Sequence, residues 1–309
     1  MSLKEDIIDG IRGQSIAKYA TWYYFRPERI LLDAGEGVSS VLRNMVFGIE
    51  SVFITHGHYD HIGGIPGLIR SRVTSRGDQS KSLTIYHPPR CTGLEQVKHY
   101  LAETSWKLPF ELVWAEMDPG ESVPLPGESK NRRIEAFEVV HSPGKMCFGY
   151  KIVETRRRLK PKYQGLFKEE IIRIKKEHGP DELTENYDQI LLCFSGDCMP
   201  LDPALAKGAE VLMHDATFVN TEDREEEFHA TVREAVESAQ AAEVQSLVLY
   251  HFSTRYQKVE ILKEIEKATR ETEVQFPVYY SNPYSLPNTR LRGMDGSPSN
   301  VKNRGGDGL

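Results

Sequence analysis

Short apolar segments recur along the whole chain, and most of them are bounded by Gly, Pro, Asp or other polar residues. Several are rich in Val, Ile, Phe and Tyr, the residues that fit the pleated and half-buried surface of a sheet. This pattern predicts strands over residues 20–24, 30–33, 51–54, 83–86, 111–114, 134–140, 148–153, 190–194, 211–214, 247–250 and 278–280.

Apolar residues with helical spacing appear between these runs. They predict helices over residues 62–73, 93–106, 167–177, 222–242 and 257–268. The chain is rich in strands over its first two thirds and alternates helices with strands near its end. We therefore expect an α/β protein in which sheets pack face to face between flanking helices.

The same pattern divides the chain. Residues 1–285 are expected to form one domain, into which residues 156–188 are inserted as a projecting, basic arm. Residues 286–309 are rich in Gly, Asn and Ser and have little to bury, so they are expected to form a mobile tail.

Charge is distributed unevenly. The 309-residue chain has a net charge of −6, but residues 151–176 carry ten Lys and Arg against three Glu, so the remainder is near −13. A basic island on an acidic body predicts a local contact with an anionic partner. No apolar run approaches the ~20 residues of a membrane helix, and the first residues do not resemble a signal peptide. These features predict a cytoplasmic protein that is not bound to a membrane.

Four possible metal ligands follow the predicted strand 51–54 within six residues, namely His56, His58, Asp60 and His61. Three further residues of suitable type stand just after other predicted strands: His141, Asp197 and His251. A lone histidine is more often a capping group, but seven such residues at strand ends favour a metal site. Imidazole and carboxylate ligands suit Zn²⁺ or a similar ion, and one ion cannot take four ligands from so short a loop. Two adjacent metals are therefore expected.

These motifs resemble the His-x-His-x-Asp-His signature of the metallo-β-lactamase superfamily and, more narrowly, the RNase Z family of tRNA 3′-processing endonucleases. The resemblance covers residues 13–278. Residues 63–68 continue the signature as in RNase Z, and residues 251–256, with the sequence His-Phe-Ser-Thr-Arg-Tyr, match a family segment. Residues 159–166 resemble the arm of the short, plant-type enzymes.

The resemblance implies an αββα four-layer sandwich and two divalent ions, with Zn²⁺ first and Mn²⁺ or Mg²⁺ as alternatives. It assigns the first ion to His56, His58, His141 and a bridging Asp197. The second ion falls to Asp60, His61, Asp197 and His251. It also implies a homodimer.

Three catalytic residues are implied as well. Asp60 would accept the proton of the attacking water, and His229 would protonate the leaving 3′-oxygen. On the predicted helix His229 shares its inward face with Val232 and Val236. Asp215 stands where the family usually has Glu, and its shorter side chain puts in doubt whether it reaches its partner.

The resemblance further implies contacts with the substrate from residues of the arm and of the segment after His251. These are Arg156, Arg157, Arg158, Lys160, Lys162, Ser253 and Arg255. The Lys and Arg side chains of the arm would contact phosphates without regard to sequence. A solvated helix face is the simpler interpretation of a charge run, but the acidic remainder of the chain favours a role in binding.

The sequence thus predicts an endoribonuclease that hydrolyses a phosphodiester at the 3′ end of precursor tRNA. The products would be a tRNA 3′-hydroxyl and a trailer with a 5′-phosphate. One alternative is a metallo-hydrolase of the same fold that acts on small phosphodiesters, cyclic nucleotides or sulfate esters. A second is a non-catalytic RNA-binding member, which the complete ligand set disfavours.

Overall fold

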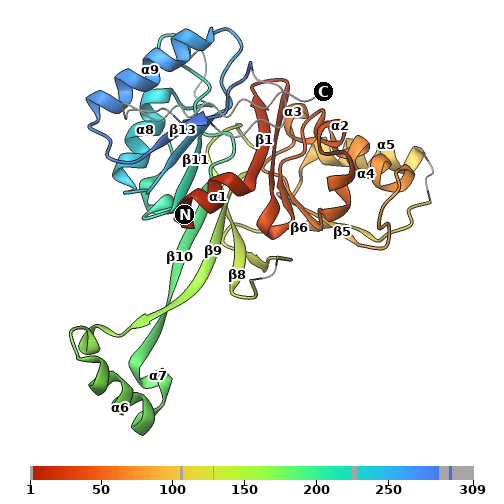
Figure 1. Ribbon diagram of the computed structural model, residues 1–309. Coiled ribbons are helices and arrows are strands. Elements are labelled where there is room, and N and C mark those ends of the chain that lie inside the picture. The colour runs from red at the N-terminus through yellow and green to blue at the C-terminus, as the bar shows by residue number, and fades with distance from the viewer. Residues whose placement is uncertain (1–2, 105–106, 128, 225–227, 285–291, 294–309) are drawn as a thin grey trace, which may run out of the picture.

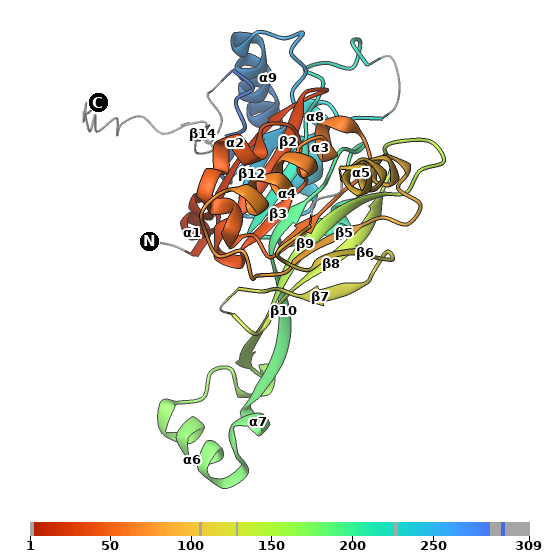
Figure 2. The ribbon, with the colours of Figure 1, turned by 90° about the vertical axis from the view of Figure 1, so that its right-hand side faces the viewer.

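Two β-sheets lie face to face in the middle of the molecule, and helices cover both outer faces (Figures 1 and 2). The computed structural model describes residues 3–104, 107–127, 129–224, 228–284 and 292–293. This arrangement confirms the predicted α/β class and the four-layer sandwich. The layers form because each sheet must bury its apolar faces against another layer.

The first sheet has six strands in sequential order. Its first three strands are antiparallel and the remaining ones are parallel. The strands are β1 (Ile11–Ile16), β2 (Ala20–Phe25), β3 (Ile30–Leu32), β4 (Ser51–Phe53), β5 (Leu83–His87) and β6 (Leu112–Glu116).

The second sheet has eight strands among the described residues. Strands β7 to β10 are antiparallel, β10 to β13 are parallel, and β14 returns antiparallel to β13. The order is β14 (Arg292–Gly293), β13 (Val278–Tyr280), β12 (Leu247–Tyr250), β11 (Val211–Asp215), β10 (Thr184–Phe194), β9 (Cys147–Leu159), β8 (Arg132–Val139) and β7 (Ser122–Pro124).

Helices occupy the outer layers and the tip of the arm. The α-helices are α1 (Leu3–Gly10), α2 (Val38–Leu42), α3 (Tyr59–Ile62), α4 (Ile65–Thr74), α5 (Thr92–Glu103), α6 (Lys168–His178), α7 (Pro180–Leu183), α8 (Val232–Ala241) and α9 (Lys258–Glu271). Short 3₁₀ helices are η1 (Arg26–Glu28), η2 (Arg43–Gly48), η3 (Pro161–Tyr163) and η4 (Pro203–Ala206).

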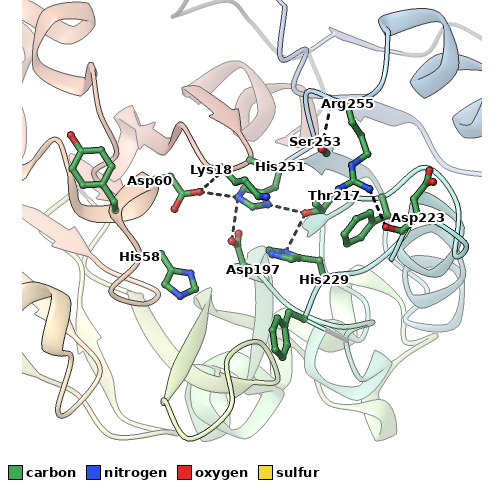
Figure 3. A pocket seen from close by; sticks show the side chains of 14 residues that line it. Lys18, His58, Asp60, Asp197, Thr217, Asp223, His229, His251, Ser253 and Arg255 are labelled. Carbon is green, nitrogen blue, oxygen red and sulfur yellow. Dashed lines mark hydrogen bonds and ion pairs between the residues drawn. The ribbon is translucent and has the colours of Figure 1, made fainter. Parts of the chain in front are cut away.

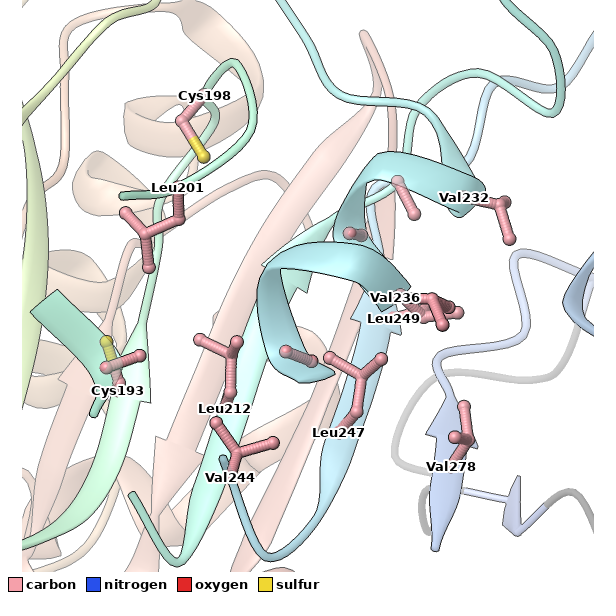
Figure 4. Packing of buried hydrophobic residues seen from close by; sticks show 14 of the residues in the cluster. Cys193, Cys198, Leu201, Leu212, Val232, Val236, Val244, Leu247, Leu249 and Val278 are labelled. Carbon is pink, nitrogen blue, oxygen red and sulfur yellow. The ribbon is translucent and has the colours of Figure 1, made fainter. Parts of the chain in front are cut away.

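Three apolar clusters hold these layers together. One lies between the two sheets, and one lies between the first sheet and helices α2 to α5. The third lies between the second sheet and helices α8 and α9; in Figure 4, α8 lies over β12, with Val236 against Leu249. Each sheet is therefore buried on both faces. This explains why the sequences of its strands are continuous apolar runs and do not alternate between apolar and polar residues.

The direction of the strands decides where polar loops meet. Strands β8 and β10 both run antiparallel to β9, so they point the same way, and β11 and β12 run parallel to β10. All four strands therefore end at one edge of the second sheet. The loops that follow them must lie side by side there, which is the arrangement that forms sites in sheets with parallel strands.

The first sheet is fixed to this edge by hydrogen bonds across the sandwich. The Phe148 amide donates to the Thr55 carbonyl oxygen (2.9 Å), and the Tyr150 hydroxyl donates to the Ile54 carbonyl oxygen (2.6 Å). The segment after β4 therefore lies against β9 and faces the loops of the second sheet.

Strands β9 and β10 continue beyond the sandwich as a two-stranded ribbon whose tip carries η3, α6 and α7 (Figures 1 and 2). At roughly 3.3 Å per residue, the eleven residues of β10 span about 36 Å. The strand that leaves the tip of this arm thus ends directly at the shared edge of the second sheet.

Several helix and tail predictions need correction. The predicted helix 222–242 is shorter, because α8 begins at Val232 and residues 221–223 form turns. Thr231 caps α8 with its side chain and pairs with Glu234 in a capping box, which fixes the start of the helix at this point. The predicted helix 62–73 is divided into α3 and α4. The predicted tail lies outside the described residues except for 292–293, which form β14.

Among the described residues, no helix is long and apolar enough to cross a membrane.

The loop after β3 is packed tightly against the segment after β4, so that a side chain at Gly35 has no space. A Cβ atom there would collide with the Asp60 carbonyl oxygen and lie 2.5 Å from the Thr21 amide nitrogen. We expect Gly35→Ala to lower the free energy of unfolding by about 1–3 kcal/mol, measured by chemical denaturation.

Gly48→Ala is the matched control for this prediction, because a Cβ at Gly48 meets only the Tyr24 hydroxyl at 3.4 Å. Equal stability of the Gly35→Ala and Gly48→Ala proteins would contradict the prediction.

Candidate metal centre

Seven residues with metal-binding side chains meet between the two sheets at the shared edge. The first sheet supplies His56 and His58 from the loop after β4 and Asp60 and His61 from the first turn of α3. The second sheet supplies one residue after each of β8, β10 and β12: His141, Asp197 and His251. All seven of the ligands expected from the sequence are thus brought together.

Three imidazoles form the first group. The Nε2 atom of His56 lies 2.9 Å from Nδ1 of His58, and Nε2 of His141 lies 3.3 Å from the same atom. His56 and His141 are buried, whereas His58 is partly open. Their nitrogen atoms therefore point at one common position.

Two carboxylates and two imidazoles form the second group. The Oδ2 atom of Asp197 lies 3.1 Å from Nε2 of His61 and 3.2 Å from Nε2 of His251. The Oδ2 atom of Asp60 lies 3.4 Å from Nε2 of His251. Because Asp197 Oδ2 is also 3.9 Å from Nε2 of His56, this carboxylate lies between the two groups.

Four of the imidazoles are oriented through the ring nitrogen that faces away from the centre. The partners of these Nδ1 atoms are Thr55 Oγ1 for His56 (3.0 Å), Asp33 Oδ2 for His61 (2.7 Å), the Phe228 carbonyl oxygen for His141 (2.9 Å) and Thr217 Oγ1 for His251 (2.8 Å). The Thr55 and Thr217 hydroxyls donate to Asp33 and Asp215, so they accept from the imidazoles. Each Nδ1 thus carries a proton, and each Nε2 is the ring nitrogen that faces the centre and is placed to bind a cation.

The residues present fit divalent cations. Asp197 is buried, and its Oδ1 atom has no hydrogen-bond partner among the described residues, which is costly for a carboxylate unless a cation is bound nearby. Burial lowers the pKa of His141 to about 4 and holds the pKa of His56 well below its usual range. Both imidazoles are therefore neutral at pH 7, the form in which histidine binds a metal.

A protonated histidine stands beside this cluster. His229 Nδ1 lies 2.7 Å from Oδ2 of Asp215, and the His229 ring stacks on His251 with centroids 5.2 Å apart. Burial acts to lower the pKa of His229, but the charge and hydrogen bond of Asp215 outweigh it and raise that pKa to about 9. The shorter side chain of Asp215 thus reaches its partner.

Asp215 is held in place by three further donors. Its carboxylate accepts from the Cys198 amide (3.0 Å) and from the amide and hydroxyl of Thr217 (2.8 and 2.7 Å). His229 itself lies in the loop before α8 and not on a helix, so its expected helical face with Val232 was wrong. Its position follows from Asp215 and from the neighbouring rings.

The cluster opens to solvent through a pocket of about 460 Å³ (Figure 3). Ser253 and Arg255, expected to contact a substrate, line this pocket together with Lys18. The Arg255 guanidinium donates to the Asp223 carbonyl oxygen (3.1 Å) and lies over the Phe218 ring. The Lys18 amide donates to Asp60 Oδ2 (2.9 Å).

The arm residues expected to bind a substrate lie far from the pocket and face acidic side chains. The ion pairs are Arg156 with Glu154 and Glu210, Arg157 with Asp181, Arg158 with Glu185, and Lys160 and Lys162 with Glu182. The antiparallel pairing of β9 with β10 sets Glu185 opposite Arg158, and α7 at the tip supplies Asp181 and Glu182.

Sequence reasoning overlooked the residues that orient the ligands. Asp33 follows β3 directly and adopts a positive φ of 55°, which turns its side chain toward Thr55 and His61. An aspartate at the end of an apolar strand was a usable signal. Thr217 and the carbonyl oxygen of Phe228 gave none, because their roles depend only on tertiary contacts.

Comparison with known proteins places the chain in a family. A family model for the beta-lactamase superfamily domain matches residues 28–160 and 186–252, and the gap between them falls on the tip of the arm. Ribonuclease Z of Listeria monocytogenes is 30% identical over 273 residues, which cover 80% of this chain and 86% of that protein. Ribonuclease Z of Methanothermobacter thermautotrophicus is 31% identical over 261 residues, which cover 77% and 81%.

The human short-form tRNase Z has a similar fold, with a TM-score of 0.56 and 22% identity over 79% of this chain and 92% of that one. The fold, the matched family model and the two relatives agree with one another and with the resemblance expected from the motifs. The chain belongs to the ribonuclease Z family within the beta-lactamase superfamily.

Proposed function

We propose that this protein is a metal-dependent endoribonuclease that cuts precursor tRNA at its 3′ end. The observation that carries the proposal is the hydrogen-bonded His229–Asp215 pair beside a cluster of seven metal-binding side chains. Hydrolysis of an unactivated phosphodiester needs both parts, because charge develops on the phosphoryl oxygens and the leaving alkoxide needs a proton. A protein that only bound RNA would need neither.

Two divalent ions, with Zn²⁺ as the first choice, fit the two groups of ligands. His56, His58 and His141 would hold one ion, Asp60, His61 and His251 would hold the other, and Asp197 would contact both. Such ions lower the pKa of water and neutralise charge on phosphoryl oxygens. The hydrogen bonds that the Nδ1 atoms donate keep the imidazoles in the tautomer and orientation that this role requires.

The protein's own residues would move the protons. Asp60 borders the pocket, and its carboxylate would accept the proton of the water that attacks phosphorus. As the bond from phosphorus to the 3′-oxygen breaks, His229 would give its proton to that oxygen. The products would be a tRNA 3′-hydroxyl and a 5′-phosphate on the trailer. The charge and hydrogen bond of Asp215 favour the protonated form of His229.

The arm would hold the body of the tRNA. Its five expected contact residues are occupied by ion pairs, whereas the described structure gives no partner to four cations of α6: Lys168, Arg173, Lys175 and Lys176. We therefore assign the main phosphate contacts to α6, because a cation already paired with a carboxylate gains less from a phosphate. The homodimer and the cytoplasmic location stay predictions.

The first experiment tests the reaction itself. The zinc-loaded protein should release a 3′-hydroxyl tRNA and a 5′-phosphate trailer from a precursor tRNA, and metal analysis should find about two ions per chain. Chelation should abolish cleavage, and added zinc should restore it. Turnover of small phosphodiesters without cleavage of the precursor would favour the alternative hydrolase, and binding of the precursor without any product would favour the non-catalytic alternative.

A second prediction concerns His229. His229→Ala should lower kcat for precursor tRNA by about 10²–10⁴-fold, the usual contribution of a positioned acid, with little change in KM. The same variant should keep most of its turnover of bis(p-nitrophenyl) phosphate, because that leaving group needs no proton. Asp215→Asn should show the same contrast between the two substrates to a smaller degree. Equal losses on both substrates would mean that His229 supports the site and does not donate a proton.

A third prediction separates the cations of the arm. The double variant Lys175→Glu/Lys176→Glu should raise KM for precursor tRNA about tenfold or more. The slope of log binding constant against log salt concentration should become shallower by about two, because about two fewer counterions are released on binding. Arg157→Ala/Arg158→Ala should have a smaller effect.

The control for the arm variant is Lys263→Glu/Lys267→Glu on α9, which makes the same change in charge on the far side of the molecule from α6 (Figure 1). If this pair weakens binding as much as the α6 pair does, net charge and not the arm determines affinity.

A further inference from the structure

An exposed aromatic side chain stands inside the ligand motif. Tyr59 is the first residue of α3, between His58 and Asp60, and 64% of its surface is exposed. Its ring lies over Gly63, where an added Cβ would come within 2.8 Å of the ring carbon Cζ. The ring is therefore held against the helix backbone while much of its surface is open to solvent.

Tyr59 forms the boundary between two hollows. It lines the pocket of the candidate metal centre and also a neighbouring groove of about 300 Å³. The opposite helix, α5, contributes Tyr100 to the groove, and 52% of this side chain is exposed. Among the described residues neither tyrosine hydroxyl has a hydrogen-bond partner in the protein.

The lining of the groove indicates the chemistry of its occupant. It contains no charged side chain, and apart from the two tyrosines its lining is glycine, apolar side chains and Gln96. An anion or a cation would find no countercharge here. A flat, uncharged ring system would stack on the tyrosines and could use Gln96 for a hydrogen bond, which is the way aromatic residues bind single-stranded nucleic acid.

The position of His229 decides which base would enter. In Figure 3, His58 and Asp60, the sequence neighbours of Tyr59, lie across Asp197 from His229. If His229 protonates the leaving 3′-oxygen, the nucleotide that precedes the cut lies on its side of the centre. The nucleotide that follows the cut stays attached to phosphorus through its 5′-oxygen, which is not in line with the leaving 3′-oxygen, so it can extend away from His229, toward Tyr59.

We propose that Tyr59 and Tyr100 form a binding site for the nucleobase of the first trailer nucleotide, directly 3′ of the cleaved bond. The inference rests on the proposed function, because it needs an RNA strand that passes through the centre. The groove adjoins the pocket at Tyr59, so this base can enter it while its phosphate stays among the ligands. The site orients the trailer without reading its sequence, since every base has a face that stacks.

The test uses the zinc-loaded protein and two precursor tRNAs that differ only at the first trailer nucleotide, which is normal in one and abasic in the other. The wild-type protein should prefer the normal substrate in kcat/KM by about tenfold, as expected for one stacked base. The Tyr59→Ala protein should lose this preference, because its kcat/KM should fall for the normal substrate and stay unchanged for the abasic one. Tyr59→Phe should keep it, and Tyr100→Ala should reduce it.

Two controls make the result specific. Tyr19→Ala removes a tyrosine that is 60% exposed but lines neither hollow, and it should keep the full preference. An abasic nucleotide placed just 5′ of the cut should leave the effect of Tyr59→Ala unchanged.

The inference is overturned if the wild-type protein cleaves both substrates equally well, or if Tyr59→Ala slows both by the same factor. In either case the proposed function would stand. If the wild-type protein cleaves neither substrate, the proposed function is wrong. The proposed binding site for the nucleobase is then rejected as well, because it rests on that function. Should Tyr59→Ala fail to fold, the preference of the Tyr100→Ala protein decides.

Discussion

The site depends on one electrostatic constraint: seven ligand side chains point lone pairs and negative charge into one largely buried space. Carboxylates and imidazole lone pairs at such short range repel one another unless a cation lies among them. The fold maintains this arrangement through the outer side of four of the five rings, where Asp33, Thr55, Thr217 and a carbonyl oxygen accept hydrogen bonds from the Nδ1 atoms. The packing of the two sheets and the need for metal are thus linked.

The direction of the strands extends the same constraint through the fold. Because β8, β10, β11 and β12 all end at one edge, residues more than a hundred positions apart in the chain meet there without long loops. The hydrogen bonds from β9 to Ile54 and Thr55 then place the loop of the first sheet opposite them. The centre is therefore as rigid as the sandwich, which favours catalysis by fixed charges.

The arm is connected to the centre through shared strands, and its own structure depends on ion pairs. It shares strands β9 and β10 with the centre, so the position of its tip is tied to the position of Asp197. Its ribbon is held by pairs of opposite charge between the two strands and the tip, and this leaves the cations of α6 available for a partner. The excess of seven positive charges in residues 151–176 is partly offset by five acidic residues between 177 and 188, of which Glu185 and Asp188 lie on the returning strand.

The sequence by itself determined the strands and singled out the candidate ligands, because both depend on local patterns. Short apolar runs define buried strands, and His141, Asp197 and His251 stand within three residues of the ends of β8, β10 and β12. Tertiary structure alone decided the rest. His229 lies in a loop because a capping box starts α8 later than the apolar periodicity suggested, and its charge comes from Asp215, which is fourteen residues away. Two of the arm's arginines are paired through tertiary contacts that no local pattern encodes: strand register sets Glu185 opposite Arg158, and Asp181 of α7 lies beside Arg157.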